Sequence, residues 1–272
     1  MKYLYTIIIL FIFGFHHSYS TQKVIIIGAS SGIGAELARQ MAACGYQVGI
    51  AGRRVELLEK VTQDFPENII SEYMDVNKPE EAKRVLDNLI ARMGGMDCIV
   101  LSAACWPEIT DAQHEGLLAS SKQIPWNAQE ITIATNVTGF TALATHAFNY
   151  FLEQGSGHLV GISSVDCVKG HHMCPAYSAS KAFISNFMEG MRNKFIQLNI
   201  PIAITDIRPG FVATHEIQND GYWVASPQEA AAQILEAIKE KKKVAYVTKR
   251  WIIVAALMQI LPDWLYNWMG GL

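Results

Sequence analysis

The sequence has little charge and no excess of basic residues. Charged residues make up 17% of the 272 residues, and the net charge at neutral pH is -3. Proteins that bind nucleic acid broadly need a basic face, so this composition disfavours that class of function. Half of the residues are hydrophobic, which is enough for a sizeable core and argues against a disordered chain.

Cysteine is also scarce, and its spacing follows no pattern. The five cysteines are Cys44, Cys98, Cys105, Cys167 and Cys174. An odd number with irregular spacing is typical of free thiols in a reducing compartment. The pair His171 and His172 lacks well-spaced further ligands, and no other Cys/His spacing fits a zinc site, so no metal is expected.

Internal repeats and long Pro/Ser/Gly linkers are absent too, and the chain alternates between short and long segments. Short apolar, β-branched runs lie at 23–27, 47–51, 68–74, 97–103, 158–164, 201–207 and 243–248. Segments with helical spacing lie between them, at Gly34–Cys44, Arg54–Gln63, Pro79–Met93, Asn127–Gln154, Ser178–Leu198 and Pro227–Lys241. Continuous apolar strands separated by helices predict one doubly wound α/β domain over residues 21–248, with a parallel sheet covered on both faces.

A hydrophobic run long enough to span a membrane is missing, although a shorter one begins the chain. It extends from Tyr3 to Phe15 after a single Lys, whereas a spanning helix needs roughly 20 residues. We predict that residues 1–20 form a secretory signal peptide cleaved near Ser20, or a short membrane anchor. A start codon placed too far upstream is the third interpretation.

The first predicted strand ends in a glycine-rich turn, IIIGASSGIGAEL, that leads into a helix. The tight turn needs a residue without Cβ at Gly28, Gly32 allows the backbone to approach a pyrophosphate, and Gly34 allows the helix to pack near the strand. Free N–H groups and the positive partial charge at the helix N-terminus suit the phosphates. A strand, this turn and a helix at the start of a βαβ unit therefore predict a dinucleotide site.

Two further positions bear on which dinucleotide binds. The second strand ends in Gly52, Arg53 and Arg54, where a carboxylate would bind the ribose hydroxyls of NAD. Arginine suits the 2′-phosphate of NADP instead, so we predict NADP(H) in preference to NAD(H), with Arg53 as the contact. Asp75, after the third strand, would accept a hydrogen bond from the adenine amine or cap the following helix.

The segment YSASK carries a phenol and an ammonium on one helix face. Tyr177 and Lys181 are four residues apart, so their side chains can converge on one site. A phenol with a pKa near 10 is almost fully protonated at neutral pH, and a nearby ammonium favours its ionised form. Tyr177 is therefore a candidate for donating a proton to a carbonyl or taking one from an alcohol.

These motifs resemble those of the short-chain dehydrogenase/reductases over residues 23–248: the glycine turn, ISS at 162–164, YSASK, and RPGFVAT at 208–214. The resemblance implies a Rossmann-type sheet with strand order 3-2-1-4-5-6-7. It implies a catalytic set of Tyr177, Lys181, Ser164 and Asn136, with Ser163 as the alternative serine. It also implies cofactor contacts from Ser30, Ser31, Ile33, Val76, Ser102, Ala103, Pro209 and Gly210, and from Val212 and Thr214 to the nicotinamide carboxamide. The family usually has Asn-Asn-Ala-Gly where this chain has Leu101-Ser102-Ala103-Ala104, which indicates local repacking.

The predicted function is an NADP-dependent oxidoreductase that interconverts a carbonyl and a secondary alcohol. Tyr177 would act as general acid and base, Ser164 would hold the reacting oxygen, and Lys181 would also bind the nicotinamide ribose. By the resemblance, Asn136 would hold a water that links Lys181 to solvent. A cofactor-binding protein of the same fold without catalysis is the alternative. Residues 165–176 are expected to line the substrate pocket, and Cys105–Trp126 and Phe211–Ala225 to be lids or ordinary loops.

The C-terminal residues 249–272 are unusually apolar. They start with two basic residues and contain three tryptophans, and they are predicted to lie in a membrane interface or to pack on the body or on a neighbouring subunit. With the apolar N-terminus, this favours a membrane-associated protein whose catalytic domain faces the cytoplasm and whose substrate is lipophilic. Export after cleavage is the alternative. The resemblance further implies a homodimer or homotetramer.

Overall fold

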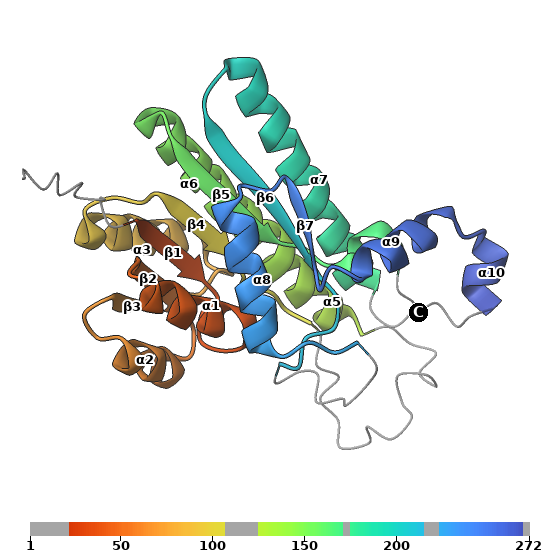
Figure 1. Ribbon diagram of the computed structural model, residues 1–272, viewed down its shortest axis with the longest axis horizontal. Helices are drawn as coiled ribbons and strands as arrows, with labels where there is room; N and C mark the ends of the chain where they lie inside the picture. The colour runs from red at the N-terminus through yellow and green to blue at the C-terminus, as the bar shows by residue number, and fades with distance from the viewer. Residues whose placement is uncertain (1–21, 107–124, 171–174, 215–222, 269–272) are drawn as a thin grey trace, which may run out of the picture.

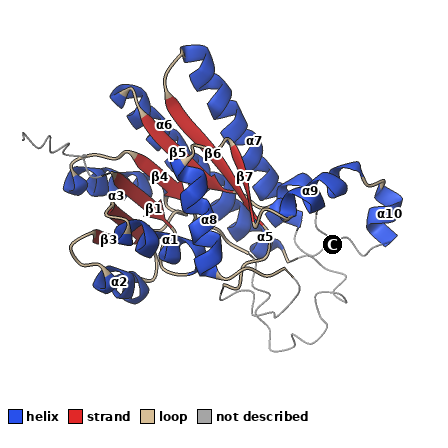
Figure 2. Ribbon diagram, viewed as in Figure 1, coloured by secondary structure: helices blue, strands red, loops and turns tan. Residues whose placement is uncertain are grey.

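The computed structural model describes residues 22–106, 125–170, 175–214 and 223–268. Within these residues, seven parallel strands form one sheet in the order β3-β2-β1-β4-β5-β6-β7 (Figures 1 and 2). The strands are β1 (Lys23–Ile27), β2 (Gln47–Gly52), β3 (Ile69–Tyr73), β4 (Cys98–Leu101), β5 (Gly157–Ile162), β6 (Ile202–Pro209) and β7 (Val244–Val247). The predicted fold class and strand order are therefore confirmed.

Helices cover both faces of the sheet, and the strands alternate their side chains between the two layers. One layer contains α1 (Gly32–Ala43), α2 (Val55–Asp64) and α8 (Pro227–Lys239); the other contains α3 (Pro79–Met93), α6 (Phe140–Gln154) and α7 (Pro175–Leu198). In β1, Val24 and Ile26 pack toward the first layer, and Ile25 and Ile27 pack toward the second. Both sides of the strand are buried, which explains why its sequence is continuously apolar.

The turns that follow β1, β4, β5 and β6 leave the sheet at its carboxyl edge. Two backbone hydrogen bonds continue the pairing beyond the strands: Ser102 N–H donates to the Ile27 carbonyl at 2.8 Å, and Ser163 N–H donates to the Ile207 carbonyl at 2.8 Å. The predicted site segments are thus brought to the edge where open α/β sheets bind ligands.

The predicted helix Asn127–Gln154 is present, but it is not a uniform α-helix. It consists of α5 (Trp126–Ile133), a π-helical turn η1 (Ala134–Gly139) and α6 in succession. A Cβ at Gly139 would lie 2.6 Å from the carbonyl oxygen of Val76, so this turn touches the segment after β3. The π-helical turn is centred on the predicted site residue Asn136, and such turns are frequent at functional sites.

The C-terminal helix α9 (Trp251–Ile260) packs on the body beside the carboxyl edge, and α10 (Asp263–Trp268) follows it at the periphery (Figure 1). The ring of Trp251 occupies the space beside Gly210, where a Cβ would lie 2.0 Å from its atoms. The Tyr266 hydroxyl donates to the Gly170 carbonyl at 3.0 Å, and Lys169 Nζ donates to the Leu261 carbonyl at 3.2 Å. Of the alternatives predicted for residues 249–272, these contacts correspond to packing on the body.

The opposite side of the same two helices is apolar and exposed. Ile253, Ile260, Trp264 and Trp268 have exposed fractions of 64%, 76%, 71% and 81%. Among the described residues, no helix is both long enough and apolar enough to cross a membrane. Contact with a membrane surface or a neighbouring subunit stays a prediction, and residues 1–20 lie outside the described residues.

A buried histidine on β5 contacts β6 and predicts that acid destabilises the fold. His158 Nε2 lies 2.7 Å from Thr205 Oγ1, and burial, together with the charge of Lys241, lowers the pKa of His158 to about 4. The folded state therefore favours the neutral ring, so its contribution to stability is present above the unfolded pKa near 6.5 and is lost as the pH falls toward 4.

We expect this histidine to account for a loss of about 3 kcal/mol in the free energy of unfolding between pH 7 and pH 4. Urea unfolding at both pH values would measure the loss in the natural chain and in His158→Gln, which keeps a hydrogen-bonding group but cannot titrate. The variant should lose less stability on acidification. Equal losses in the two proteins would contradict the assignment.

Candidate active site

The glycine-rich turn after β1 is built on close backbone contacts. Gly28 has φ +88°, and a Cβ there would lie 2.4 Å from the backbone nitrogen of Ala103. A Cβ at Gly34 would lie 2.4 Å from the carbonyl oxygen of Gly28, so the start of α1 approaches the turn directly. Gly32 has φ +57°, and a Cβ built at this position would lie 3.0 Å from the methyl group of Thr214. The three glycines leave a backbone cradle at the N-terminus of α1, and Thr214 lies beside it.

The side chain of Arg54 binds this turn, whereas the sequence predicted its neighbour Arg53 as the contact. Arg54 donates from Nη2 to Ser31 Oγ at 2.5 Å and to Ser30 Oγ at 3.0 Å. Arg53 is exposed next to it, and none of the described hydrogen bonds or ion pairs involves its side chain. The structure thus adds Arg54 to the residues at the cofactor turn, where its guanidinium fixes the two serine side chains.

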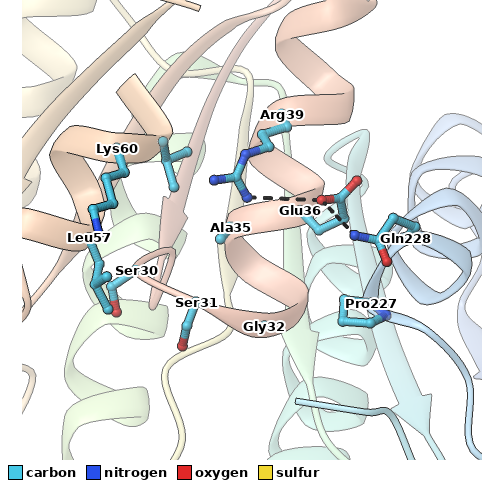
Figure 3. A pocket seen from close by; sticks show the side chains of 11 residues that line it. Ser30, Ser31, Gly32, Ala35, Glu36, Arg39, Leu57, Lys60, Pro227 and Gln228 are labelled. Atoms are coloured by element: carbon cyan, nitrogen blue, oxygen red, sulfur yellow. Dashed lines mark hydrogen bonds and ion pairs between the residues drawn. The ribbon is translucent and has the colours of Figure 1, made fainter. Parts of the chain in front are cut away.

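A hollow of about 250 Å³ lies on the outer side of the turn, between α1, α2 and the start of α8 (Figure 3). Ser30, Ser31 and Lys60 line it. Arg39 also lines it, but its Nε is already paired with Asp64 at 2.6 Å. Tyr177 and Lys181 are not among its lining residues, so the hollow is separate from that pair.

The segment after β3 is shaped by local hydrogen bonds. Asp75 Oδ1 accepts from the Asn77 backbone N–H at 3.0 Å, and the Asn77 side chain accepts from Thr135 Oγ1 at 2.9 Å. Lys78, not Asp75, is the residue that precedes α3. Asp75 therefore stabilises a turn before the helix, which is close to the capping alternative. The adenine contact of Asp75 and Val76 stays a prediction.

Tyr177 and Lys181 lie on the same face of α7, as their spacing predicts. Lys181 Nζ is 5.4 Å from the centre of the Tyr177 ring, and the lysine side chain is only 2% exposed. Its ammonium donates to the Ile162 carbonyl, at the end of β5, at 3.0 Å. Trp106 packs edge-on against the Tyr177 ring, with 4.5 Å between ring centres. The phenol is thus held between a buried cation and an indole.

The two candidate serines have different surroundings. Ser163 donates to the buried carboxylate of Asp206, so its hydroxyl is directed into the core. Ser164 begins the short helix η2 (Val165–Val168), and its Oγ accepts from the Asp166 backbone N–H at 3.1 Å. This arrangement favours Ser164 over Ser163 as the serine of the site, although its contact with a substrate stays a prediction.

Asn136 uses its side chain to brace the chain after β4. Its Oδ1 accepts from the Cys105 N–H at 2.7 Å, and its Nδ2 donates to the Cys105 carbonyl and to Ser180 Oγ, both at 3.0 Å. The side chain is fully buried. The amide thereby ties the segment before Trp106 to α7, and the water proposed at this residue stays a prediction.

The RPGFVAT segment returns toward the glycine turn. Gly210 N–H donates to the Val247 carbonyl at 2.6 Å, and Ala213 N–H donates to the Ala225 carbonyl at 2.8 Å. Val212 is 4% exposed and forms an isolated bridge with Ala225. In the segment that departs from the family pattern, Ala104 is exposed, so its methyl group demands no repacking of the protein. Residues 107–124, 171–174 and 215–222, which include parts of the expected lids and pocket, lie outside the described residues.

A comparison with protein families shows to which family this chain belongs. The model described as short chain dehydrogenase matches residues 22–225, which include the glycine turn, Ser164, Tyr177 and Lys181. This chain belongs to the short-chain dehydrogenase family. Membership makes it an oxidoreductase of a family that binds nicotinamide cofactors.

Other short-chain dehydrogenases resemble this chain over most of its length. An oxidoreductase of Mycobacterium tuberculosis (strain H37Rv), described as uncharacterized, is 31% identical over 250 residues, covering 89% of this chain and 94% of the relative. The acetoacetyl-CoA reductase of Acinetobacter sp. is 30% identical over 248 residues, covering 84% and 94%. The 11-beta-hydroxysteroid dehydrogenase 1A of Arabidopsis thaliana is 28% identical over 270 residues, covering 90% and 73%.

Solved structures share the fold of this chain. ElxO with NADP bound superposes with a TM-score of 0.73 at 20% identity, covering 86% of this chain and 99% of that chain. A short-chain type dehydrogenase/reductase from Mycobacterium ulcerans superposes with a TM-score of 0.72 at 21% identity, covering 85% and 90%. At this identity the likeness supports the fold and no finer property.

Proposed function

We propose that this short-chain dehydrogenase interconverts a carbonyl compound and a secondary alcohol, with NADP(H) as the preferred cofactor. The placement of the Tyr177 phenol beside the buried Lys181 ammonium, at the sheet edge that also carries the glycine cradle, is the observation on which the proposal rests. A phenol is a poor acid at neutral pH unless a nearby charge stabilises its anion. The buried ammonium provides that charge.

The residues at the edge fit a nicotinamide dinucleotide. Gly28, Gly32 and Gly34 leave no side chain between the backbone and a pyrophosphate, and the N-terminus of α1 points free N–H groups toward it. Val212 and Thr214 would hold the nicotinamide end. When bound, the cofactor supplies or accepts a hydride at the substrate carbon.

The protein's own groups would handle the proton and orient the substrate. In the direction of reduction, Tyr177 donates its proton to the carbonyl oxygen, and Ser164 donates a hydrogen bond to the same oxygen. Lys181 stabilises the resulting phenolate and restores the proton through solvent. In the direction of oxidation the same groups act in reverse, with Tyr177 accepting the proton of the alcohol.

A broad assay of the natural chain tests this function. NADPH oxidation would be followed by absorbance with short-chain, aromatic, steroid and fatty-acyl ketones, and NADPH binding would be measured by fluorescence. Turnover with at least one carbonyl class supports the proposal, and the apolar tail leads us to expect it among lipophilic ketones. Binding without turnover across the panel would support the catalytically silent alternative instead.

The cofactor preference is attributed to the arginines that follow β2. Arg54 is fixed by Ser30 and Ser31 beside the cradle, so a 2′-phosphate there would meet a placed guanidinium and two hydroxyl groups. A hydrogen bond to a charged group contributes about 1.5–3 kcal/mol, which corresponds to about a tenfold to hundredfold change in affinity.

We expect Arg54→Met to weaken NADPH binding by about tenfold or more and to leave NADH binding within about twofold, because NADH has no 2′-phosphate. Fluorescence titration with both cofactors measures the ratio, and NADH serves as the internal control. Arg53→Met, measured beside it, shows which arginine makes the larger contribution. Equal losses for NADPH and NADH in both variants would contradict a 2′-phosphate contact.

A further inference from the structure

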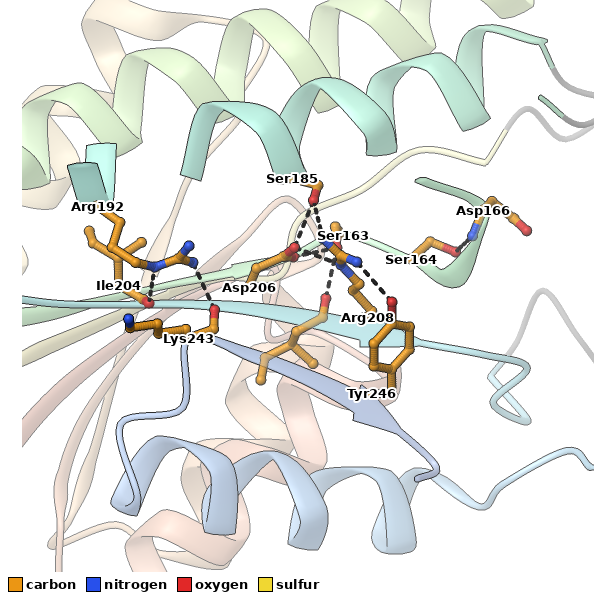
Figure 4. A network of polar contacts seen from close by, with 11 residues as sticks. Ser163, Ser164, Asp166, Ser185, Arg192, Ile204, Asp206, Arg208, Lys243 and Tyr246 are labelled. Carbon is orange, nitrogen blue, oxygen red and sulfur yellow. Dashed lines mark hydrogen bonds and ion pairs between the residues drawn. The ribbon is translucent and has the colours of Figure 1, made fainter. Parts of the chain in front are cut away.

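A buried network of charged and polar side chains lies between the ends of β5 and β6 and helix α7 (Figure 4). At its centre is Asp206, a carboxylate on β6 with an exposed fraction of 1%. Its Oδ2 accepts from Ser185 Oγ and from Arg208 Nε, both at 2.8 Å, and its Oδ1 accepts from Ser163 Oγ. A buried carboxylate is strongly unfavourable unless such donors surround it, and these three donors meet that need.

Each of the three partners belongs to a different segment of the proposed active site. Ser163 immediately precedes Ser164. Ser185 follows Lys181 by one helical turn on α7, on the same face of the helix. Arg208 is the last residue but one of β6, and its Nη1 donates to the hydroxyl of Tyr246 at 2.8 Å. One carboxylate thus joins β5, α7 and β6 at the point where the site residues follow.

The end of β5 is held from two sides. Lys181 Nζ donates to the Ile162 carbonyl at 3.0 Å, and the next residue, Ser163, donates to Asp206. The Ser163 backbone is also paired with the Ile207 carbonyl, so the sheet holds the end of β5, and the bond to Asp206 fixes the Ser163 side chain. Asp206 also accepts from Ser185, so its carboxylate links the end of β5 to the helix that carries Tyr177 and Lys181.

We propose that Asp206 is a positioning residue that sets the placement of Ser164 relative to the Tyr177–Lys181 pair. It touches neither the proposed substrate position nor the cofactor cradle, and it acts through Ser163, Ser185 and Arg208. The inference rests on the proposed function, because Asp206 would hold the groups of that reaction in position relative to one another.

The charge of Asp206 is part of this role. Burial opposes the charge of Arg208, but Asp206, the neighbouring Cys167 and the hydrogen bonds to Asp206 and Tyr246 together raise the pKa of Arg208. An asparagine at position 206 keeps the size of the side chain but leaves the guanidinium without its anion. It also replaces one acceptor oxygen with a donor, so Ser163 or the pair Ser185 and Arg208 loses its partner.

The experiment compares Asp206→Asn with a matched control on the same pair of elements. Arg192 also bridges α7 and β6: it donates from Nε to the Ile204 carbonyl at 3.3 Å and from Nη2 to the Lys243 carbonyl at 2.8 Å (Figure 4). Arg192→Met removes these contacts at the other end of β6. Both variants should lose stability, and only the first should alter the site.

We expect Asp206→Asn to lower kcat by about tenfold to a hundredfold, because small misplacements of catalytic groups have effects of that size. The KM for NADPH should stay within about threefold, because the cradle is not touched. The isotope effect on kcat with deuterated NADPH should rise, since the chemical step becomes rate-limiting. Arg192→Met should keep the wild-type kcat and isotope effect while its unfolding midpoint falls.

A second variant keeps the test decisive if Asp206→Asn does not fold. Ser163→Ala removes one arm of the network without leaving a buried charge unpaired, and it should lower kcat by about fivefold or more with a small change in stability. Wild-type kcat in either variant, or an equal loss of kcat in Arg192→Met, would overturn the inference and leave the proposed reaction intact. Absence of turnover in the natural chain on every carbonyl would overturn both.

Discussion

Replacing Tyr177 with Phe should lower kcat for carbonyl reduction by about a thousandfold, because a positioned general acid contributes between about a hundredfold and ten thousandfold. The ring would remain packed between Trp106 and the Lys181 ammonium, so the fold and the cofactor cradle should be unchanged. Only the proton donor is lost. Stopped-flow measurement of hydride transfer from bound NADPH to a substrate ketone would report the loss directly.

Tyr150→Phe is the matched control for this substitution. The Tyr150 hydroxyl accepts from the Met96 backbone N–H at 3.2 Å, on α6 and away from the site. Its removal should cost about 1 kcal/mol of stability and leave kcat unchanged. If Tyr177→Phe transferred hydride at the wild-type rate, the phenol would not be the acid, and the proposed mechanism would be wrong.

The second large effect is expected at Gly28, where Ala should abolish NADPH binding and lower the free energy of unfolding by about 3 kcal/mol or more. Two causes add at this position. The backbone has φ +88°, which is unfavourable for a residue with a side chain, and the new Cβ would meet the Ala103 backbone at 2.4 Å. To relieve the contact, the turn after β1 must move away from the segment after β4, and the cradle is deformed.

Gly45→Ala separates the two causes. Gly45 has φ +86°, almost the same as Gly28, but nothing lies within 4 Å of a Cβ built there. This variant should lose about 1–2 kcal/mol from backbone strain alone and bind NADPH normally. Thermal unfolding and fluorescence titration of both variants give the comparison. If the two variants lose the same stability and both still bind NADPH, the close contact at Gly28 has no role in the cofactor site.

The sheet could be predicted from the sequence because its central strands are buried on both sides and are therefore continuously apolar. The edge strands β3 and β7 are only partly buried, and Tyr73 and Val244 are exposed at their ends. The run KVIII corresponds to β1 residue by residue, and the glycine turn follows it at the predicted place. The π-helical turn could not be predicted. The apolar spacing of α5 and α6 continues through it, and the partner of Asn136 is Cys105, which lies 31 residues earlier in the chain.

The site residues could be predicted where they belong to one short motif. The prediction missed residues whose contact partners lie far away in the sequence. Tyr177 and Lys181 face one another because four residues make about one helical turn. Choosing between Arg53 and Arg54 depends on how the chain leaves β2 and enters α2, which adjacent arginines do not reveal. Asp206 was overlooked, although a signal existed: the run PIAITDIR places two opposite charges two residues apart, on the same face of a buried strand.

The packing of Trp251 against Gly210 has a consequence for chimaeras between this protein and its relatives. The indole fills the space that a side chain at position 210 would need, so the residues at 210 and 251 are sterically complementary. A graft that exchanges the last helices but retains the glycine would leave a hole under the proline-glycine turn. The reverse graft would wedge that turn open, so positions 210 and 251 have to be inherited as one unit.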